Sequence, residues 1–99
     1  MPRRTDSNQA AIVEALRGVG CIVQDLSRVG KGCPDLLCSY VDPRTGRATN
    51  LLIEVKTATG KLEKNQVIWH ALWRGSVVVV RTVDEALQAV GQLREANDG

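Results

Sequence analysis

Apolar residues recur along the chain with two different spacings, which divide it into helices and strands. A spacing of three and four positions, typical of one face of a helix, occurs in three segments: residues 7–18, 62–74 and 82–93. Four shorter apolar runs have the length of strands: residues 21–26, 35–41, 51–57 and 77–80. We therefore predict seven elements in the order α-β-β-β-α-β-α.

The segment between the second and third apolar runs determines how these two strands pair. Residues 42–47 (Asp-Pro-Arg-Thr-Gly-Arg) have proline and glycine where a tight turn needs them, which predicts an antiparallel hairpin. If the hairpin folds about Arg44 and Thr45, its register places Asp35 directly opposite Glu54. A bulge in either strand would shift this pairing by one or two residues.

The remaining apolar positions predict how the elements pack. Residues 77–80 are four valines, which predicts a strand buried on both faces. Because a helix precedes them, this strand should run parallel to the third strand. The helical stripes are Ile12, Ala15, Leu16 and Val19 in the first helix, and Leu62, Ile68, Trp69, Leu72 and Trp73 in the second.

These elements describe an α/β protein with a mixed four-stranded sheet flanked by helices. Its length of 99 residues suits a single domain over residues 1–99. We expect residues 1–6 and 96–99 to be flexible, since both lie outside the periodic segments.

Three polar residues in the paired strands form the candidate chemistry. Alternate residues of a strand share a face, so Glu54 and Lys56 point to one side and Val55 points into the core. Asp35 adds a second carboxylate, because directly opposed residues have Cβ atoms roughly 4.5–5.5 Å apart, where like charges repel. A divalent cation between the two carboxylates would turn this repulsion into a ligand set, and Mg²⁺ suits such oxygen ligands.

Composition narrows the class of protein further. The hydrophobic content of 43% is that of a folded domain, and the net charge of +2 is too small to indicate nucleic-acid binding by itself. Cys21, Cys33 and Cys38 lack the C-x-x-C spacing of zinc sites, which favours reduced thiols. No apolar run has the length of a membrane span, and the first residues lack the apolar core of a signal peptide. We therefore expect a cytoplasmic protein that does not bind membranes.

Asp35, Glu54 and Lys56, followed by a helix and a further strand, resemble the PD-(D/E)XK nuclease superfamily. Residues 32–37 (Gly-Cys-Pro-Asp-Leu-Leu) and 52–56 (Leu-Ile-Glu-Val-Lys) resemble its VRR-NUC and Holliday-junction-resolvase-like branch, in particular small phage or prophage proteins. The resemblance extends to Asn8-Gln9, residues 29–32, Gln66, Trp69-His70 and Arg74-Gly75. It covers nearly the whole chain and implies a restriction-endonuclease-like core.

The resemblance implies a metal-dependent DNA endonuclease that hydrolyses phosphodiester bonds, with branched DNA such as four-way junctions as substrate. Asp35 and Glu54, with the backbone carbonyl of Val55, would hold Mg²⁺ or Mn²⁺. Lys56 would orient the attacking water, stabilise the developing charge, or act as a base. No organic cofactor is implied. Symmetric cutting of a junction needs two sites, so the resemblance favours a homodimer in a bacterial or phage-infected cell.

Two helical positions are candidates to complete the site. Many members of the superfamily have a glutamate in the first helix, and alignment on Gly20 places Gln9 there. Glu14 is the alternative, but it lies about 140° around the helix from Gln9, so both cannot face the site. Gln66 lies one turn before His70 on one side of the second helix, and the resemblance implies that Gln66 contacts the site or the DNA backbone.

The loop before Asp35 is the candidate nucleic-acid interface. Gly30 and Gly32 allow its backbone to approach a phosphate, and Arg28 and Lys31 supply positive charge. A solvated, flexible loop is the alternative. Lys61 would extend the basic surface. His70 would either contact nucleic acid or serve as a structural residue beside Trp69, and Trp69 and Trp73 are expected in the core or in a dimer contact.

Two other functions remain open at this point. Double-stranded-RNA-binding domains share the order α-β-β-β-α, but they need a basic cluster at the start of the last helix, and residues 62–65 (Leu-Glu-Lys-Asn) are not one. A degenerate nuclease fold that binds nucleic acid without cutting it is the other alternative, because the first helix lacks the expected acid.

Overall fold

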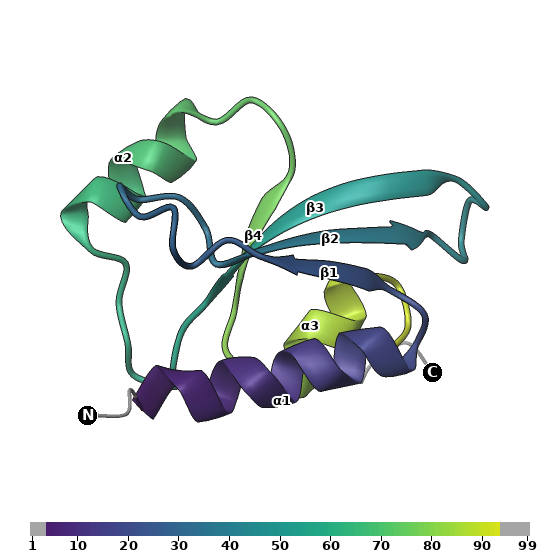
Figure 1. Cartoon of the computed structure of the whole chain (residues 1–99). Helices are drawn as coiled ribbons and strands as arrows, with labels where there is room; N and C mark the ends of the chain where they lie inside the picture. The colour runs from purple at the N-terminus through teal and green to yellow at the C-terminus, as the bar shows by residue number, and fades with distance from the viewer. Residues whose placement is uncertain (1–3, 94–99) are drawn as a thin grey trace.

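The computed structural model describes residues 4–93 and has the predicted order of elements (Figure 1). The elements are α1 (Arg4–Gly18), β1 (Ile22–Asp25), β2 (Leu36–Val41), β3 (Ala48–Val55), α2 (Lys64–Leu72), β4 (Val77–Val80) and α3 (Val83–Ala89). The expected flexibility of residues 1–3 and 96–99 falls outside the described residues, whereas residues 4–6 form the first turn of α1. Among residues 4–93, no helix has the length and apolarity needed to span a bilayer.

The four strands form one mixed sheet in the order β1-β2-β3-β4. The β1–β2 and β2–β3 pairs are antiparallel, and β3 and β4 are parallel as predicted. The β2–β3 ladder pairs Leu36 with Ile53 at one end and Val41 with Ala48 at the other, which confirms the predicted register without a bulge. One residue beyond the Leu36–Ile53 pair, this register brings Asp35 opposite Glu54.

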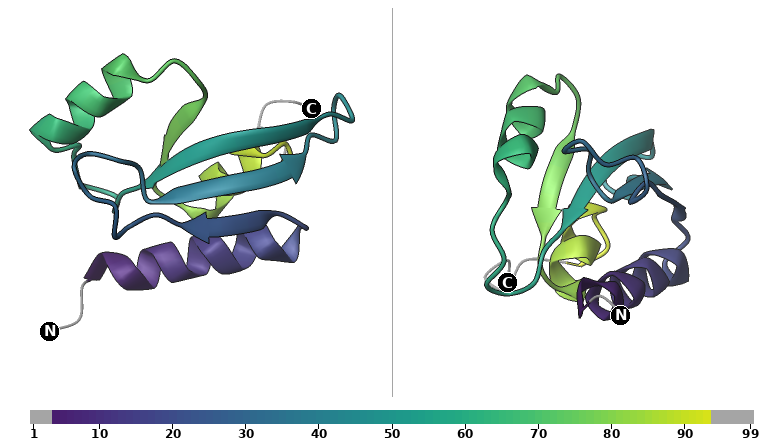
Figure 2. Two further views of the ribbon diagram at one scale, coloured as in Figure 1. Left: turned by 45° about the horizontal axis from the view of Figure 1, so that its top comes forward. Right: turned by 60° about the vertical axis from the view of Figure 1, so that its left-hand side comes forward.

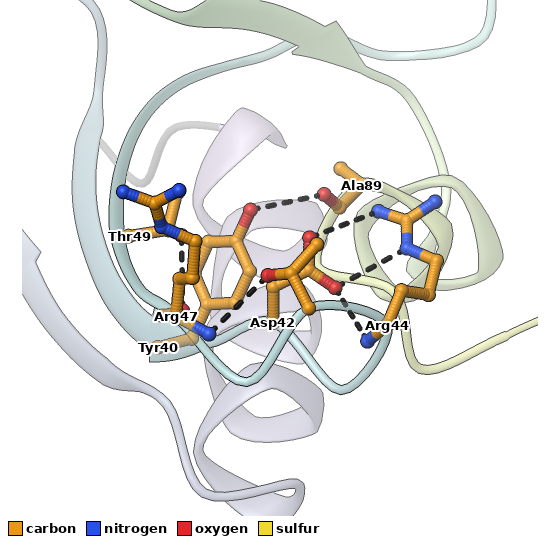
Figure 3. A network of polar contacts seen from close by, with 7 residues as sticks. Tyr40, Asp42, Arg44, Arg47, Thr49 and Ala89 are labelled. Atoms are coloured by element: carbon orange, nitrogen blue, oxygen red, sulfur yellow. Dashed lines mark hydrogen bonds and ion pairs between the residues drawn. The ribbon is translucent and has the colours of Figure 1, made fainter.

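The tip of the β2–β3 hairpin is fixed by Asp42 (Figure 3). Its Oδ1 accepts the backbone N–H of Arg44 at 2.9 Å and also contacts the Arg44 Nε at 3.2 Å. Its carbonyl oxygen accepts the N–H of Gly46 at 2.7 Å. Beside the turn, the Tyr40 hydroxyl reaches the carbonyl of Ala89, 3.5 Å away at the end of α3. These contacts hold the turn that sets the register of the two strands.

The core lies between one face of the sheet and the pair α1 and α3 (Figure 2). Ile12 and Leu16 of the predicted stripe are fully buried against Leu36 and Ile53, while Val19 at the helix end is exposed. Each fully buried aliphatic side chain of this kind contributes about 1.5–3 kcal/mol to folding. Ala86 of α3 and Val90, directly after that helix, are fully buried in the same core. All three cysteines are free, and Cys21 and Cys38 belong to this core.

The apolar stripe predicted for the second helix does not enter the core, so that prediction is wrong. Figure 1 shows α2 on the side of the sheet opposite α1 and α3. No residue of α2 is buried, and Ile68 and Leu72 are 51% and 73% exposed. Trp69 and Trp73 stack on each other, with ring centroids 4.6 Å apart. The helix instead packs on the loop before β2, where Gly32 meets its backbone.

The valine strand also differs from its prediction. We expected residues 77–80 to be buried on both faces, but only Val80 is buried and the other three valines are partly exposed. The reason is its position, because β4 is the last strand of the sheet and pairs only with β3.

Gly32 and Gly20 offer a matched test of how the loop before β2 packs on α2. Both have positive φ angles, +87° and +97°. A Cβ at Gly32 would lie 2.5 Å from the Asn65 carbonyl oxygen, whereas one at Gly20 meets nothing within 4 Å. We expect Gly20→Ala to cost about 1–2 kcal/mol in the free energy of unfolding from backbone strain alone. Gly32→Ala should cost about 1–3 kcal/mol more because of the added collision.

Urea unfolding of both variants measures this difference. Equal losses of stability would contradict the close packing of the loop on α2.

Candidate active site

Asp35 lies immediately before β2 and is held against the end of β3 by its backbone and its side chain. Its N–H donates to the carbonyl of Ile53 at 3.1 Å, and its Oδ2 accepts the N–H of Val55 at 2.8 Å. Its own carbonyl accepts the N–H of Leu26 at 2.7 Å, which joins it to the end of β1. These bonds fix the Asp35 carboxylate beside Glu54 of β3, the strand that the sequence predicted to pair with the Asp35 segment.

Glu54 is the one charged residue buried among residues 8–93, with 1% of its surface exposed. The Gln66 Nε2 donates to Glu54 Oε2 at 3.2 Å. The Gln66 Oε1 at the same time accepts the N–H of Glu63 at 2.8 Å, as in a capping box at the start of α2. Gln66 therefore ties the helix N-terminus to the carboxylate.

The other oxygen of Glu54 has no such partner. Its Oε1 lies 3.5 Å from the Nε2 of His70, one turn further along α2. Both atoms are buried, and within residues 8–93 neither has a hydrogen-bond partner. The His70 side chain is only 15% exposed. The structure thus turns His70 toward Glu54, whereas the sequence left open either a contact with nucleic acid or a structural role beside Trp69.

Burial and the neighbouring carboxylate change the acidity of Glu54. Desolvation, followed by hydrogen bonding and repulsion from Asp35, raises the pKa of Glu54 to about 8, and the positive charge of Lys56 offsets part of this. Burial and the same lysine lower the pKa of His70. An unpartnered buried oxygen and a neighbouring carboxylate both raise the free energy of ionised Glu54. A bound cation would offset both costs.

Lys56 lies close enough for its charge to act on both Glu54 and His70. Within residues 8–93 it forms no ion pair. Its N–H donates to the carbonyl of Val80 at 3.0 Å, which continues the pairing with β4. Its carbonyl accepts Asn8 Nδ2 at 3.0 Å. Both contacts fix the backbone that carries the lysine.

The sequence analysis named Asn8 in the family resemblance but gave it no role at the site. Its helical spacing could have indicated a contact with the sheet. Asn8 lies one turn before Ile12 and two turns before Leu16, on the face of α1 that packs on the sheet. Gln9, one position later, instead donates to Asp25 Oδ2 at 3.5 Å on β1. Glu14 is exposed. Neither of the two predicted helical candidates is seen in contact with Asp35 or Glu54.

Cys33 is the second residue near the site without a predicted role. Burial raises the pKa of its thiol, and the charges of Glu54 and Asp35 raise it further, so the thiol lies close to both carboxylates. Its place in the Gly-Cys-Pro-Asp segment, two residues before Asp35, was the available signal.

The loop before β2 carries the predicted basic residues on its surface. Arg28 and Lys31 are exposed, and Lys31 has a φ of +59° between Gly30 and Gly32, which also have positive φ. A lysine in this conformation is uncommon and costs energy, which is typical of loops shaped for function. Lys61 is exposed on the connection after β3.

That connection is anchored by Arg81, which the sequence analysis did not single out. Its Nη1 donates to the carbonyls of Thr57 and Gly60, both at 2.6 Å. Charged donors make hydrogen bonds about twice as strong as neutral ones. The clamp holds the segment that joins Lys56 to Lys61 against the end of β4.

The metal-ligating side chains gathered here are few. Among residues 4–93 there is no group of three or more His, Cys, Asp and Glu side chains arranged as a ready metal site. The donors that fit Mg²⁺ or Mn²⁺ are the two carboxylates, to which main-chain oxygens and waters can add. The orphaned Oε1 of Glu54 is the observation that favours a cation at this place.

The mixed sheet, the paired Asp35 and Glu54, and a lysine two positions after the glutamate together define a protein of the PD-(D/E)XK nuclease type. The VRR-NUC domain model matches residues 3–85, and the chain therefore belongs to the VRR-NUC family, a branch of that superfamily. Membership indicates a nuclease, which binds nucleic acid. Neither the curated proteins nor the solved structures contained a match to the chain.

The raised pKa of Glu54 predicts how stability depends on pH without metal. The folded state keeps a proton that the unfolded state loses above its ordinary value of 4.5, so this stabilisation declines until pH passes about 8. His70 acts with the opposite sign, but only as pH falls below its ordinary value of 6.5. Between these limits, from pH 6.5 to 8, we expect stability to fall with rising pH by at most about 1.4 kcal/mol per unit.

Chemical denaturation across this pH range in EDTA measures the slope. Glu54→Gln should reduce it, and Glu14→Gln, an exposed acid on α1, should leave it unchanged. A Glu54→Gln variant with the wild-type slope would show that another group is responsible.

Proposed function

We propose that this protein is a metal-dependent endodeoxyribonuclease that hydrolyses phosphodiester bonds, with branched or otherwise structured DNA as substrate. The observation that carries this proposal is the forced proximity of Asp35 to a buried, half-satisfied Glu54, with the ammonium group of Lys56 nearby. Membership of the VRR-NUC family supports the reaction class.

In this proposal Asp35 and Glu54, with the backbone carbonyl of Val55, hold Mg²⁺ or Mn²⁺. When bound, such an ion polarises the scissile phosphate and lowers the pKa of a coordinated water. Gln66 keeps the Glu54 carboxylate in place through its hydrogen bond to Oε2. Lys56, which forms no ion pair within residues 8–93, orients the attacking water and stabilises the charge that develops on the phosphate.

The DNA backbone would lie along the exposed lysine and arginine side chains around this centre. Arg28 and Lys31 project from the loop before β2, and Lys61 from the connection after β3, so positive charge is available on two segments next to the site. Gly30 and Gly32 allow the loop its left-handed backbone, which places Lys31 at its turn. We leave Gln9 out of the centre because its amide is engaged by Asp25.

A homodimer completes the proposal. Two symmetric cuts in a four-way junction require two sites related by a two-fold axis. Exposed apolar side chains at the C-terminal end of α2 support such an assembly, because Ile68, Leu72 and Trp73 lie outside the core.

One observation favours the alternative of a nuclease fold that binds nucleic acid without cutting it. Among residues 8–18 of α1, Gln9 is bonded to Asp25 and the one acid, Glu14, is exposed, so neither completes the carboxylate pair. A nuclease fold that binds nucleic acid without cutting it would tolerate this loss. The double-stranded-RNA-binding alternative loses its basis, because the family match extends through the parallel strand β4 that follows α2.

Cleavage of labelled duplex, flap and four-way-junction DNA in Mg²⁺, Mn²⁺ or EDTA tests the proposal. Metal-dependent cutting of the branched forms supports it. Binding with no cutting in either metal favours the non-catalytic alternative, and cutting of RNA in place of DNA would contradict the assigned substrate.

Removal of either carboxylate should stop cutting without unfolding the protein. Asp35→Asn and Glu54→Gln each remove a ligand charge and also relieve the repulsion between the two groups, so the fold should survive. We expect the cleavage rate to fall by at least about 100-fold in each variant. Glu14→Gln, which changes an exposed acid on α1, is the matched control and should cut at the native rate.

Lys56→Ala should lose turnover more than metal affinity, because the lysine acts on the water and the developing charge and not on the ion. We expect kcat to fall by about 100-fold or more while the metal concentration for half-maximal activity changes little. Lys64→Ala, at an exposed lysine of α2, serves as the control. Native turnover in Lys56→Ala would remove the lysine from the reaction.

A further inference from the structure

The face of the sheet that carries Glu54 continues into a small cleft that the candidate active site does not use. Alternate residues of a strand share a face, so Leu52 lies on the same face as Glu54, about 7 Å along β3. Leu52 pairs with Leu37 of β2, and neither belongs to the core between the sheet and α1. Both leucines line a cleft of about 260 Å³. The cleft is therefore continuous with the site.

The segment that joins α2 to β4 lines the cleft from the other side. Trp73, Gly75 and Ser76 contribute from this segment, and Asn50 contributes from β3. Trp73 stacks on Trp69 with the two ring planes 16° apart, and it is still 46% exposed. The stack thus holds a partly open indole ring at the cleft.

The volume and the lining of the cleft suit one flat heterocycle. A cavity of roughly 150 Å³ accommodates benzene, whereas pockets for drug-sized ligands begin at about 300 Å³. The volume of this cleft lies between the two. An exposed indole offers a stacking surface to any nucleobase. The exposed amide of Asn50 carries both a donor and an acceptor, as the edge of a base does.

The neighbouring site identifies the occupant. Membership of the VRR-NUC family indicates that nucleic acid binds this protein, and a nucleotide at Glu54 has its base within reach of a cleft one pleat away. We propose that the cleft takes one unpaired nucleobase of the bound DNA, stacked on Trp73. A paired base is held inside the duplex and does not reach such a pocket.

This inference rests on the proposed function for the DNA at Glu54, and it names the feature of structured DNA that is recognised, a nucleotide outside the duplex. It gives Trp73 a role other than the core or dimer contact expected from the sequence. Ile68 and Leu72, the other apolar residues that support a homodimer, do not line the cleft. A dimer contact through them therefore does not require it.

Binding of two matched DNAs tests the proposal. Fluorescence anisotropy in EDTA compares a duplex that has one extra, unpaired adenine with the same duplex lacking it. We expect the wild-type protein to bind the bulged duplex about tenfold more tightly or better, and Trp73→Ala to lose this preference while binding the paired duplex as before. Leu72→Ala, at an exposed position outside the cleft, is the matched control and should keep the preference.

An abasic site at the bulge separates stacking from a general effect of the substitution. Removal of the unpaired base should cost the wild-type protein the same factor, and should cost Trp73→Ala nothing further, because both changes remove one contact. Equal affinity of the wild-type protein for the bulged and paired duplexes, or binding of neither, would overturn the proposal. An equal loss for both duplexes in Trp73→Ala would also overturn it. If ultracentrifugation then shows that this variant has lost a dimer, a second copy occupies the cleft.

A measurement on the wild-type protein covers the case in which Trp73→Ala does not fold. Iodouracil at the unpaired position crosslinks under ultraviolet light to the aromatic ring on which it stacks. We expect mass spectrometry to place the crosslink on Trp73. A crosslink on another residue, or none, would overturn the assignment.

The outcomes distinguish this inference from the nuclease proposal. Recognition of the unpaired base through Trp73, in a protein that cuts no DNA in either metal, would retain the cleft and remove the nuclease. Metal-dependent cutting by a protein that binds the bulged and paired duplexes equally would remove only the base-binding cleft.

Discussion

The antiparallel pairing of β2 with β3 is the constraint on which the rest of this structure depends. Backbone hydrogen bonds and the burial of Leu36 and Ile53 set the register, and the register leaves Asp35 and Glu54 no freedom to separate. The repulsion between the two carboxylates is thus offset by strand pairing and core burial elsewhere in the fold. This is the usual origin of strongly perturbed acidity at functional positions.

The helices on the two faces of the sheet affect the Asp35–Glu54 pair in different ways. On one side, α1 and α3 form the core that makes the sheet rigid, and Asn8 extends this layer to the backbone of Lys56. On the other side, α2 brings Gln66 and His70 to Glu54. The stability of the domain comes mainly from the first layer, and the chemistry of the carboxylate is adjusted by the second.

The features predicted correctly from the sequence were those that local rules determine. The turn through Asp42 and Gly46 has a favoured geometry, so the strand register followed from it. The family resemblance and the order of elements were confirmed for the same reason, since both depend on residues close in sequence.

The predictions that were wrong concern contacts between elements that are distant in sequence, which local residue patterns do not determine. The stripe of α2 has the same spacing as a core helix, but the neighbours of Ile68 and Leu72 were not encoded in that spacing. The valines of β4 did not indicate that the strand would be at an edge. Gln9 was chosen over its neighbour Asn8 by alignment, while the contact with the backbone of Lys56 belongs to Asn8.

Because α2 contributes no buried side chain, little hydrophobic free energy opposes its local opening. Its attachment relies on packing against the loop at Gly32 and on the side chains that reach Glu54. Whatever occupies the carboxylates therefore also decides how firmly this helix is docked, and amide hydrogens in α2 should report ligand occupancy more sensitively than those of α1. In this small domain, ordering of a whole helix is coupled to the state of one glutamate.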